Sequence, residues 1–191
     1  MDLRYKIKTA PAFSTVALGQ LKRNLRIEHG DQDDLLTEIL DRAVFASQMA
    51  TGRCYARSTV TLYLDAFPEG SEVAIDAGPV DVIISVKYYP PNSAPIATVD
   101  PAKYQLDNTD LTARLRFLEP FAPDTTRMNV IEIEFTTGWA DAASVPKDLV
   151  EAIILRASEA YFNPGNAEKN FGGIRTVASE RKERNYSIQR Y

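Results

Sequence analysis

From Ser14 to Gly52 the chain reads STVALGQLKRNLRIEHGDQDDLLTEILDRAVFASQMATG, and this stretch specifies a pair of helices. Leucines recur at helical spacing in its first part (Leu18, Leu21 and Leu25). Their spacing predicts a helix over about residues 15–26, and Ser14 is a suitable N-cap for it. The pair His29-Gly30 then ends the pattern and predicts a short turn.

A second helix is predicted from Asp31 to the glycine at position 52, which is expected to stop it. Asp33 and Asp34 fall in its first turn, where the positive end of the helix dipole favours carboxylates. Its apolar side chains form one face (Leu35, Leu36, Ile39, Leu40, Ala43, Val44 and Ala50). Two such helices joined by a short turn should pack as an antiparallel hairpin.

From Cys54 onward the apolar period changes from helical to twofold, which is typical of β-strands. The strand candidates are residues 59–64, 73–75, 82–89, 96–99, 104–106, 113–118 and 129–136. Proline and glycine separate these runs, and no helical run lies between them. The pattern favours an antiparallel sheet or a small sandwich.

A third helix is predicted over about Val145 to Tyr161, with Pro146 in its first turn and Asn163-Pro164-Gly165 at its end. Its apolar residues cover more than one face, so we expect the hairpin, the sheet or a neighbouring subunit to bury it. The remaining residues, 166–191, have too little apolar content to build a core.

The predicted fold class is therefore α+β. It combines a three-helix bundle, made of the helical hairpin and the later helix, with an antiparallel β-rich insertion between the second and third helices. An extended C-terminal tail follows. Four segments are predicted: the N-terminal arm with the hairpin (1–53), the β-rich insertion (54–140), the third bundle helix (141–165) and the tail (166–191). The arm is expected to be an extended lead-in. Together the segments form one composite domain plus tail.

Composition narrows the class of protein. The chain has 191 residues, a net charge of −4 and one cysteine, Cys54, which cannot pair within the chain. Residues 163–191 carry six Lys or Arg against three Glu, so the tail is basic and the body acidic. An acidic body argues against duplex DNA binding as the main task. No stretch approaches the roughly 20 apolar residues of a membrane span, so we expect no membrane partner.

No pattern in the sequence indicates a catalytic, cofactor or metal site. Residues 31–34 read Asp-Gln-Asp-Asp but lack the glycine and the glutamate that complete a calcium loop. His29 is the only histidine, which leaves no cluster for zinc. Glu132 and Glu134 lie two residues apart and are expected on one solvated strand face.

Several stretches resemble the tailed-phage head-tail connector family, also called head-completion or adaptor proteins, in its longer, β-inserted branch that is also found in gene transfer agents. The resemblance rests on residues 18–27 and 33–36, Thr51-Gly52-Arg53, Val86-Lys87-Tyr88-Tyr89, residues 135–139 and Val145-Pro146. These stretches span about residues 14 to 165, and the tail beyond Asn166 does not align.

The resemblance implies a non-enzymatic structural subunit that forms a homo-oligomeric ring, a dodecamer in the particle, beneath the portal protein. Such a ring extends the DNA channel without sequence-specific DNA binding and docks the next neck, stopper or tail-completion protein. The implied location is the neck of the virion, with assembly in the host cytoplasm.

In similar proteins the C-terminal region grips the portal. The candidate contacts with the portal or a neighbouring subunit are therefore in the tail: Arg175, Arg181, Lys182, Arg184, Tyr186, Ile188, Arg190 and Tyr191.

Two alternatives come from other classes of protein. A small-ligand or carbohydrate-binding module could use tyrosines of the β-rich insertion (Tyr63, Tyr88, Tyr89 and Tyr104), provided that they gather in a concave cluster. A hydrolase could use His29 with the nearby aspartates, because catalytic triads assemble in space rather than in sequence.

Overall fold

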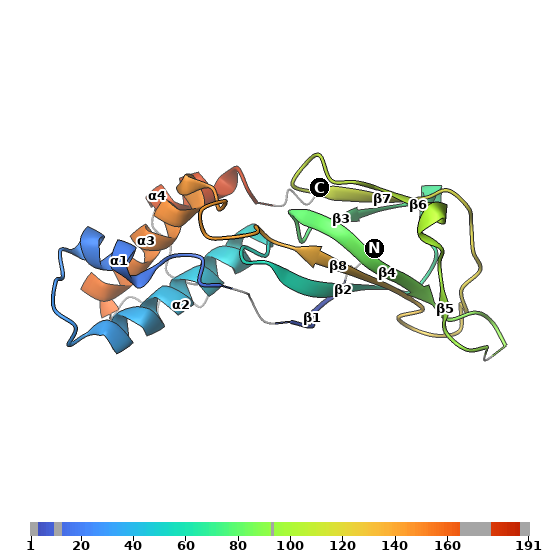
Figure 1. Ribbon diagram of the computed structural model, residues 1–191, viewed down its shortest axis with the longest axis horizontal. Helices are drawn as coiled ribbons and strands as arrows, with labels where there is room; N and C mark the ends of the chain where they lie inside the picture. The colour runs from blue at the N-terminus through green and yellow to red at the C-terminus, as the bar shows by residue number, and fades with distance from the viewer. Residues whose placement is uncertain (1–3, 10–12, 93, 165–176, 188–191) are drawn as a thin grey trace. The chain divides into compact units, whose positions relative to one another are not determined.

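The structure is a computed structural model that describes residues 4–9, 13–92, 94–164 and 177–187 (Figure 1). It confirms the α+β class. The chain divides into two compact units, each built from separate parts of the sequence. Residues 1–12 and 57–138 form what we call the β unit, and residues 13–56 and 139–191 form the helical unit.

The helical unit contains α1 (Leu18–Leu25), α2 (Asp33–Thr51), α3 (Lys147–Phe162) and α4 (Val177–Arg184). The first three are the predicted hairpin and third helix. Their apolar faces meet in one buried core, whose members are Val16, Leu21, Leu36, Ile39, Leu40, Ala43, Tyr55, Val145, Leu149, Ile153 and Ala157. The sequence did not predict α4, which lies within the expected tail.

The start of α1 differs from the prediction. Ser14 does not cap the helix, because its hydroxyl donates to the carbonyl of Val16 at 2.9 Å. Val16 is fully buried, and the helix begins after it, with Ala17 as the N-cap. The backbone N–H of Ala17 donates to Gln20 Oε1 at 3.1 Å, so a glutamine side chain satisfies the N–H of the N-cap residue. Gly52, with φ at 72°, ends α2 as predicted.

The β unit contains two antiparallel sheets. The larger has the order β1 (Arg4–Ile7), β2 (Ser58–Leu64), β8 (Ile131–Thr137), β4 (Val80–Tyr88) and β5 (Ala97–Thr98). The smaller has the order β3 (Glu72–Ile75), β7 (Ala113–Phe117) and β6 (Tyr104–Asp107). The short helices η1 (Glu69–Ser71) and η2 (Pro101–Lys103) precede β3 and β6. The antiparallel sheets agree with the prediction, whereas β1 was expected only as an extended lead-in.

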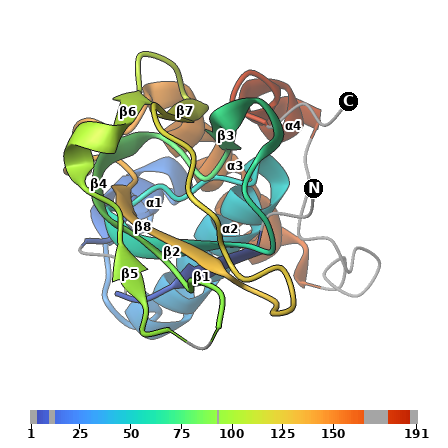
Figure 2. The same ribbon diagram turned by 90° about the vertical axis from the view of Figure 1, so that its right-hand side faces the viewer.

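Figure 2 shows the strands of both sheets of the β unit. Buried side chains from both sheets contribute to the core of this unit. Along β8 the residues alternate, with Ile131, Ile133 and Phe135 buried and the two glutamates, at positions 132 and 134, half-buried on the other face. Aromatic rings connect the two sheets, since the ring of Phe121 lies 4.5 Å from that of Tyr88 on β4 and 5.3 Å from that of Phe117 on β7. No helix among the described residues is long and apolar enough to cross a membrane.

Candidate interaction surface at the C-terminal helix

The predicted contact residues divide into those that the structure describes and those outside it. Outside the described residues lie Arg175, Ile188, Arg190 and Tyr191. The others belong to α4 or to the turn after it: Arg181, Lys182, Arg184 and Tyr186. Arg181 and Arg184 are exposed, so they form a basic surface on α4.

Lys182 and Tyr186 contact the helical unit itself. Lys182 Nζ lies 2.7 Å from Glu151 Oε2 and 3.6 Å from Asp148 Oδ1, both on α3. The hydrogen bond to Glu151 raises the pKa of Lys182 above its ordinary value. Tyr186 packs on the helical core, and its carbonyl accepts a hydrogen bond from Arg53 Nε at 2.5 Å. Both residues therefore help to hold α4 and its turn on the body of the helical unit.

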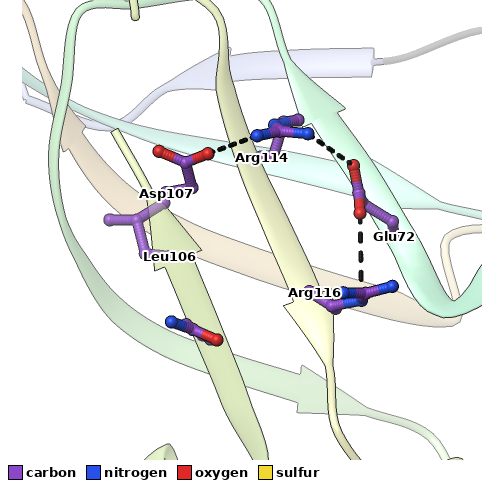
Figure 3. A pocket seen from close by; sticks show the side chains of 6 residues that line it. Glu72, Leu106, Asp107, Arg114 and Arg116 are labelled. Atoms are coloured by element: carbon purple, nitrogen blue, oxygen red, sulfur yellow. Dashed lines mark hydrogen bonds and ion pairs between the residues drawn. The ribbon is translucent and has the colours of Figure 1, made fainter. Parts of the chain in front are cut away.

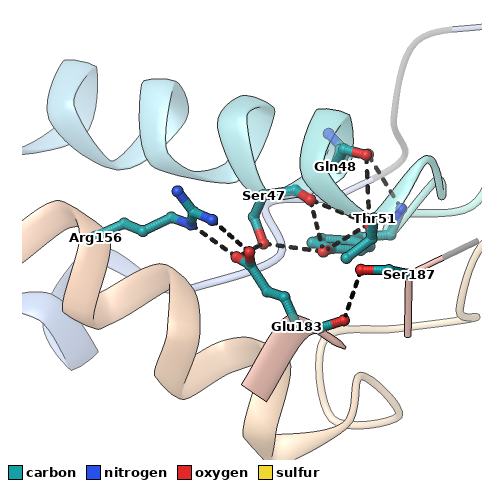
Figure 4. Close-up of polar contacts among 7 residues, drawn as sticks. Ser47, Gln48, Thr51, Arg156, Glu183 and Ser187 are labelled. Carbon is teal, nitrogen blue, oxygen red and sulfur yellow. Dashed lines mark hydrogen bonds and ion pairs between the residues drawn. The ribbon is translucent and has the colours of Figure 1, made fainter. Parts of the chain in front are cut away.

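A buried ion pair links α4 to α3 (Figure 4). The side chains of Arg156 on α3 and Glu183 on α4 are 1% and 3% exposed. Arg156 Nε donates to Glu183 Oε1 at 2.7 Å, and Nη2 donates to Oε2, so the contact is bidentate. Bidentate guanidinium–carboxylate pairs are among the strongest and most directional hydrogen-bonded contacts in proteins.

Hydroxyl groups from α2 and the residues after it extend this pair into a network. Ser47 Oγ donates to Glu183 Oε1 at 2.6 Å and lies 2.9 Å from Tyr55 Oη. Tyr55 Oη also lies 3.0 Å from Thr51 Oγ1 and donates to the Ser47 carbonyl at 3.1 Å. Burial raises the pKa of Tyr55 to about 12, so this hydroxyl keeps its proton at neutral pH. The network joins α2, α3 and α4.

A pocket of about 210 Å³ lies beside this network. Arg156 lines it together with Ala50 of α2, and α4 and its following turn supply the rest of the lining (Glu180, Glu183, Arg184 and Ser187). Charged side chains therefore form most of its wall, and α4 contributes most of them.

The sequence indicates this network through polar residues on the otherwise apolar, buried faces of two helices. On α3 the buried positions recur at Leu149 and Ile153 and then at Arg156, where an arginine stands in place of an apolar residue. On α2 the buried face likewise carries Ser47 after Ala43. Polar residues on core stripes must find buried partners. The partner, Glu183, could not be identified from spacing because it is far away in the sequence.

A second pocket, of about 290 Å³, lies on the three-stranded sheet of the β unit (Figure 3). Arg114 Nη2 lies 2.5 Å from Asp107 Oδ2, and Arg114 Nη1 lies 3.9 Å from Glu72 Oε1. Arg116 Nε lies 4.0 Å from Glu72 Oε2. The lining thus pairs two cations with two carboxylates. Because both arginine side chains are largely exposed, the arrangement is that of a solvated strand face rather than of a ligand site.

The four tyrosines considered for a carbohydrate module are all half-buried: Tyr63, Tyr88, Tyr89 and Tyr104. Tyr88 packs on Phe121, and the guanidinium carbon of Arg127 lies 4.1 Å from the centre of the Tyr89 ring. Tyr104 is half-buried on β6, and burial raises its pKa. Each of these three rings therefore has a packing role within the β unit.

The groups considered for chemistry are not assembled into a site. His29 is exposed, and its Nδ1 lies 3.7 Å from Oδ2 of the exposed Asp31. Cys54 is partly buried, and burial raises the pKa of its thiol. Among the residues that the structure describes, no group of three or more His, Cys, Asp or Glu side chains is placed to hold a metal ion.

Comparison with known proteins gives a consistent result at the level of the fold. No protein-family model and no curated protein matches the chain. Among solved structures it is similar to a chain in the neck of an empty gene transfer agent particle computed with C6 symmetry, with 20% identity and a TM-score of 0.77, covering 98% of this chain and 97% of that one.

Two further structures agree. A chain from the virion of a native gene transfer agent particle has 20% identity and a TM-score of 0.76, over 98% of this chain and 96% of that one. A chain from the neck of the native particle computed with C12 symmetry has 19% identity and a TM-score of 0.73, over 98% and 97%. The resemblance that the sequence indicates is therefore confirmed at the level of the fold.

Proposed function

We propose that this protein is a structural subunit in the neck of a tailed phage, prophage or gene transfer agent particle. In this role it forms a ring beneath the portal, extends the DNA channel and offers a platform for the next neck or tail protein. The role requires no catalytic group, cofactor or metal ion.

One observation carries the proposal: the fold agrees over nearly the whole of both chains with a chain from a particle neck. The similarity includes the β unit and the helical unit together, because it covers 98% of this chain and 97% of the first neck chain. A fold alone does not fix a function. Here, however, two observations agree on the neck: the similar fold comes from a neck chain, and the sequence resemblance also implies a neck protein.

The surface of the chain supports an assembling role. Large apolar side chains are exposed in both units, including Phe45 and Met49 one helical turn apart on α2, at 64% and 67% exposure. Val82 and Ile84 are likewise half exposed on β4. Exposed apolar groups of this size are typical of surfaces that a partner covers. A ring would supply such a partner at every subunit.

The test is the assembly state of the purified chain, alone and with a portal. We expect rings in negative-stain images and a single closed oligomer in native mass spectrometry when the portal is present. The double substitution Phe45→Ser and Met49→Ser should weaken the ring, because it removes exposed apolar area that a neighbour would cover, whereas Glu38→Gln on the same helix should not. A chain that remains monomeric with the portal at high concentration would contradict the proposal.

No observation favours the ligand-binding alternative to the same degree. The pockets on the sheets of the β unit are about 290 Å³ each, and charged pairs or packed rings form their walls. Ligand sites normally combine an apolar concavity with a few converging polar groups.

A further inference from the structure

The helix α4 is held in an unusual way for an element of a helical bundle. Residues 180–184 are all charged, and among them only Glu183 is buried. A helix of this length is not stable alone in water, so contacts with the body must hold it in place. Among the described residues of α4 and its turn, those contacts include the buried pair with Arg156, the partly exposed bridge of Lys182 and the packing of Tyr186 on the core.

The two ion pairs of α4 differ greatly in how strongly they hold the helix on the body. In the bridge of Lys182 to Glu151 and Asp148 both carboxylates are exposed, and such bridges contribute little because water competes for them. The pair between Arg156 and Glu183 is closed to water and is supported by Ser47. Removing the Glu183 carboxylate would take a bidentate partner away from the buried guanidinium, which is strongly unfavourable if Arg156 stays buried.

The core that the structure describes in the helical unit is formed without α4. Among the described side chains, every fully buried member of that core belongs to α1, α2, α3 or their flanking residues, and Tyr186, beyond α4, adds a partly buried ring. Opening of α4 would also let water reach Arg156 through the adjoining 210 Å³ pocket, which Arg156 already lines. If the pair is lost, release of α4 can therefore bring Arg156 into contact with water while the other helices stay packed.

We propose that Glu183 and Arg156 form a latch, which holds α4 on α2 and α3 and can open while the rest of the helical unit stays folded. The latch fixes the register of α4, because the bidentate geometry accepts the carboxylate in one position only. This inference concerns the free chain and does not depend on the proposed neck function.

The first test uses the unmodified full-length chain. Native-state hydrogen exchange in increasing urea separates local from global opening, because the dependence on urea grows with the surface exposed. We expect the α4 amides to exchange through a smaller opening with a weaker urea dependence than the amides of α2 and α3. Identical isotherms for α3 and α4 would overturn the latch.

The second test removes the charge of the latch in a nearly isosteric variant, Glu183→Gln. Exchange of the α4 amides should become faster by roughly tenfold or more, as expected for loss of a charged hydrogen bond, while α2 and α3 keep their protection. The matched control is Glu180→Gln, which makes the same change at an exposed position of α4 and should leave exchange there unchanged.

Three results with these variants would overturn the proposal. The first is unchanged protection of α4 in Glu183→Gln. The second is a parallel loss of protection in α2, α3 and α4, and the third is failure of that variant to fold. Either of the last two would mean that α4 is an integral part of the bundle.

Discussion

Arg156 occupies a position on α3 that an apolar residue would normally fill. It follows Leu149 and Ile153 on the buried stripe of this helix. Its guanidinium is tolerated there because Glu183 accepts two hydrogen bonds from it. Such a pair contributes directional specificity more than net stability, since both ions lose their hydration on burial.

Tyr55, another residue of this network, should make stability depend on pH above 10. Burial raises its pKa in the folded protein to about 12, from an ordinary value of 10.0. Because the folded value lies above the unfolded one, the stabilising contribution is fully present below pH 10 and is lost as the pH rises towards 12. A shift of this size corresponds to about 3 kcal/mol.

Comparison of the variant Tyr55→Phe with the unmodified chain should reveal this dependence of stability on pH. At neutral pH it should lose about 1–3 kcal/mol, because Ser47 and Thr51 lose a buried hydrogen-bond partner. The free energy of unfolding, measured in urea at several pH values, should then differ less from that of the unmodified chain as the pH rises from 10 to 12. A constant difference across that range would show that the Tyr55 hydroxyl is not buried in this way.

At the scale of elements, α3 is the centre of the helical unit, and Ile153 tests its packing. This side chain is fully buried in the core that α1, α2 and α3 share. Ile153→Ala should therefore cost about 2–5 kcal/mol in the free energy of unfolding, measured by denaturant titration. The neighbouring Ile154→Ala is the control, and it should cost clearly less because Ile154 is only half-buried. Equal losses in the two variants would mean that the core is not centred on this face of α3.

The elements that the sequence predicted are those with a strong local pattern. The apolar period located α1, α2 and α3, and the twofold alternation located β2, β4 and β8. Two elements were missed because tertiary contacts create them. The strand β1 pairs with β2, although the whole helical hairpin separates them in the sequence. Residues 4–7 also lack a strong apolar pattern. The helix α4 is held by residues far away in the sequence, including Arg156 in the buried ion pair.

The network around α4 was less predictable than the fold. The resemblance indicated the tail, and the candidate contacts chosen there are mostly cations, whereas the buried residue of α4 is Glu183. A glutamate within a charged run gives no sign of burial in a single sequence. Only the geometry of α2, α3 and α4 identifies it, together with Ser47 and Arg156.

At the scale of the whole molecule, the chain passes between its two units more than once. Residues 1–12 belong to the β unit, 13–56 to the helical unit, 57–138 to the β unit again, and 139–191 to the helical unit. The segments predicted from the sequence are consecutive, whereas the compact units are not, because local patterns cannot show which distant strand an N-terminal arm joins. A truncation near residue 56 would therefore divide both units, whereas one near residue 138 would divide only the helical unit.

The basic surface of α4 is a candidate contact with the portal or a neighbouring subunit. Arg181 and Arg184 are exposed, unlike the buried Glu183 between them, and neither belongs to the described core of the helical unit. The double substitution Arg181→Glu and Arg184→Glu should leave the free energy of unfolding within about 0.5 kcal/mol, because surface substitutions have small effects. Attachment to portal-bearing heads, measured by co-sedimentation, should nevertheless weaken and lose part of its dependence on salt. The control Arg23→Glu reverses the charge of an exposed arginine on α1 and should attach normally. Equal attachment by the double variant and the unmodified chain would show that the contact lies elsewhere on the molecule.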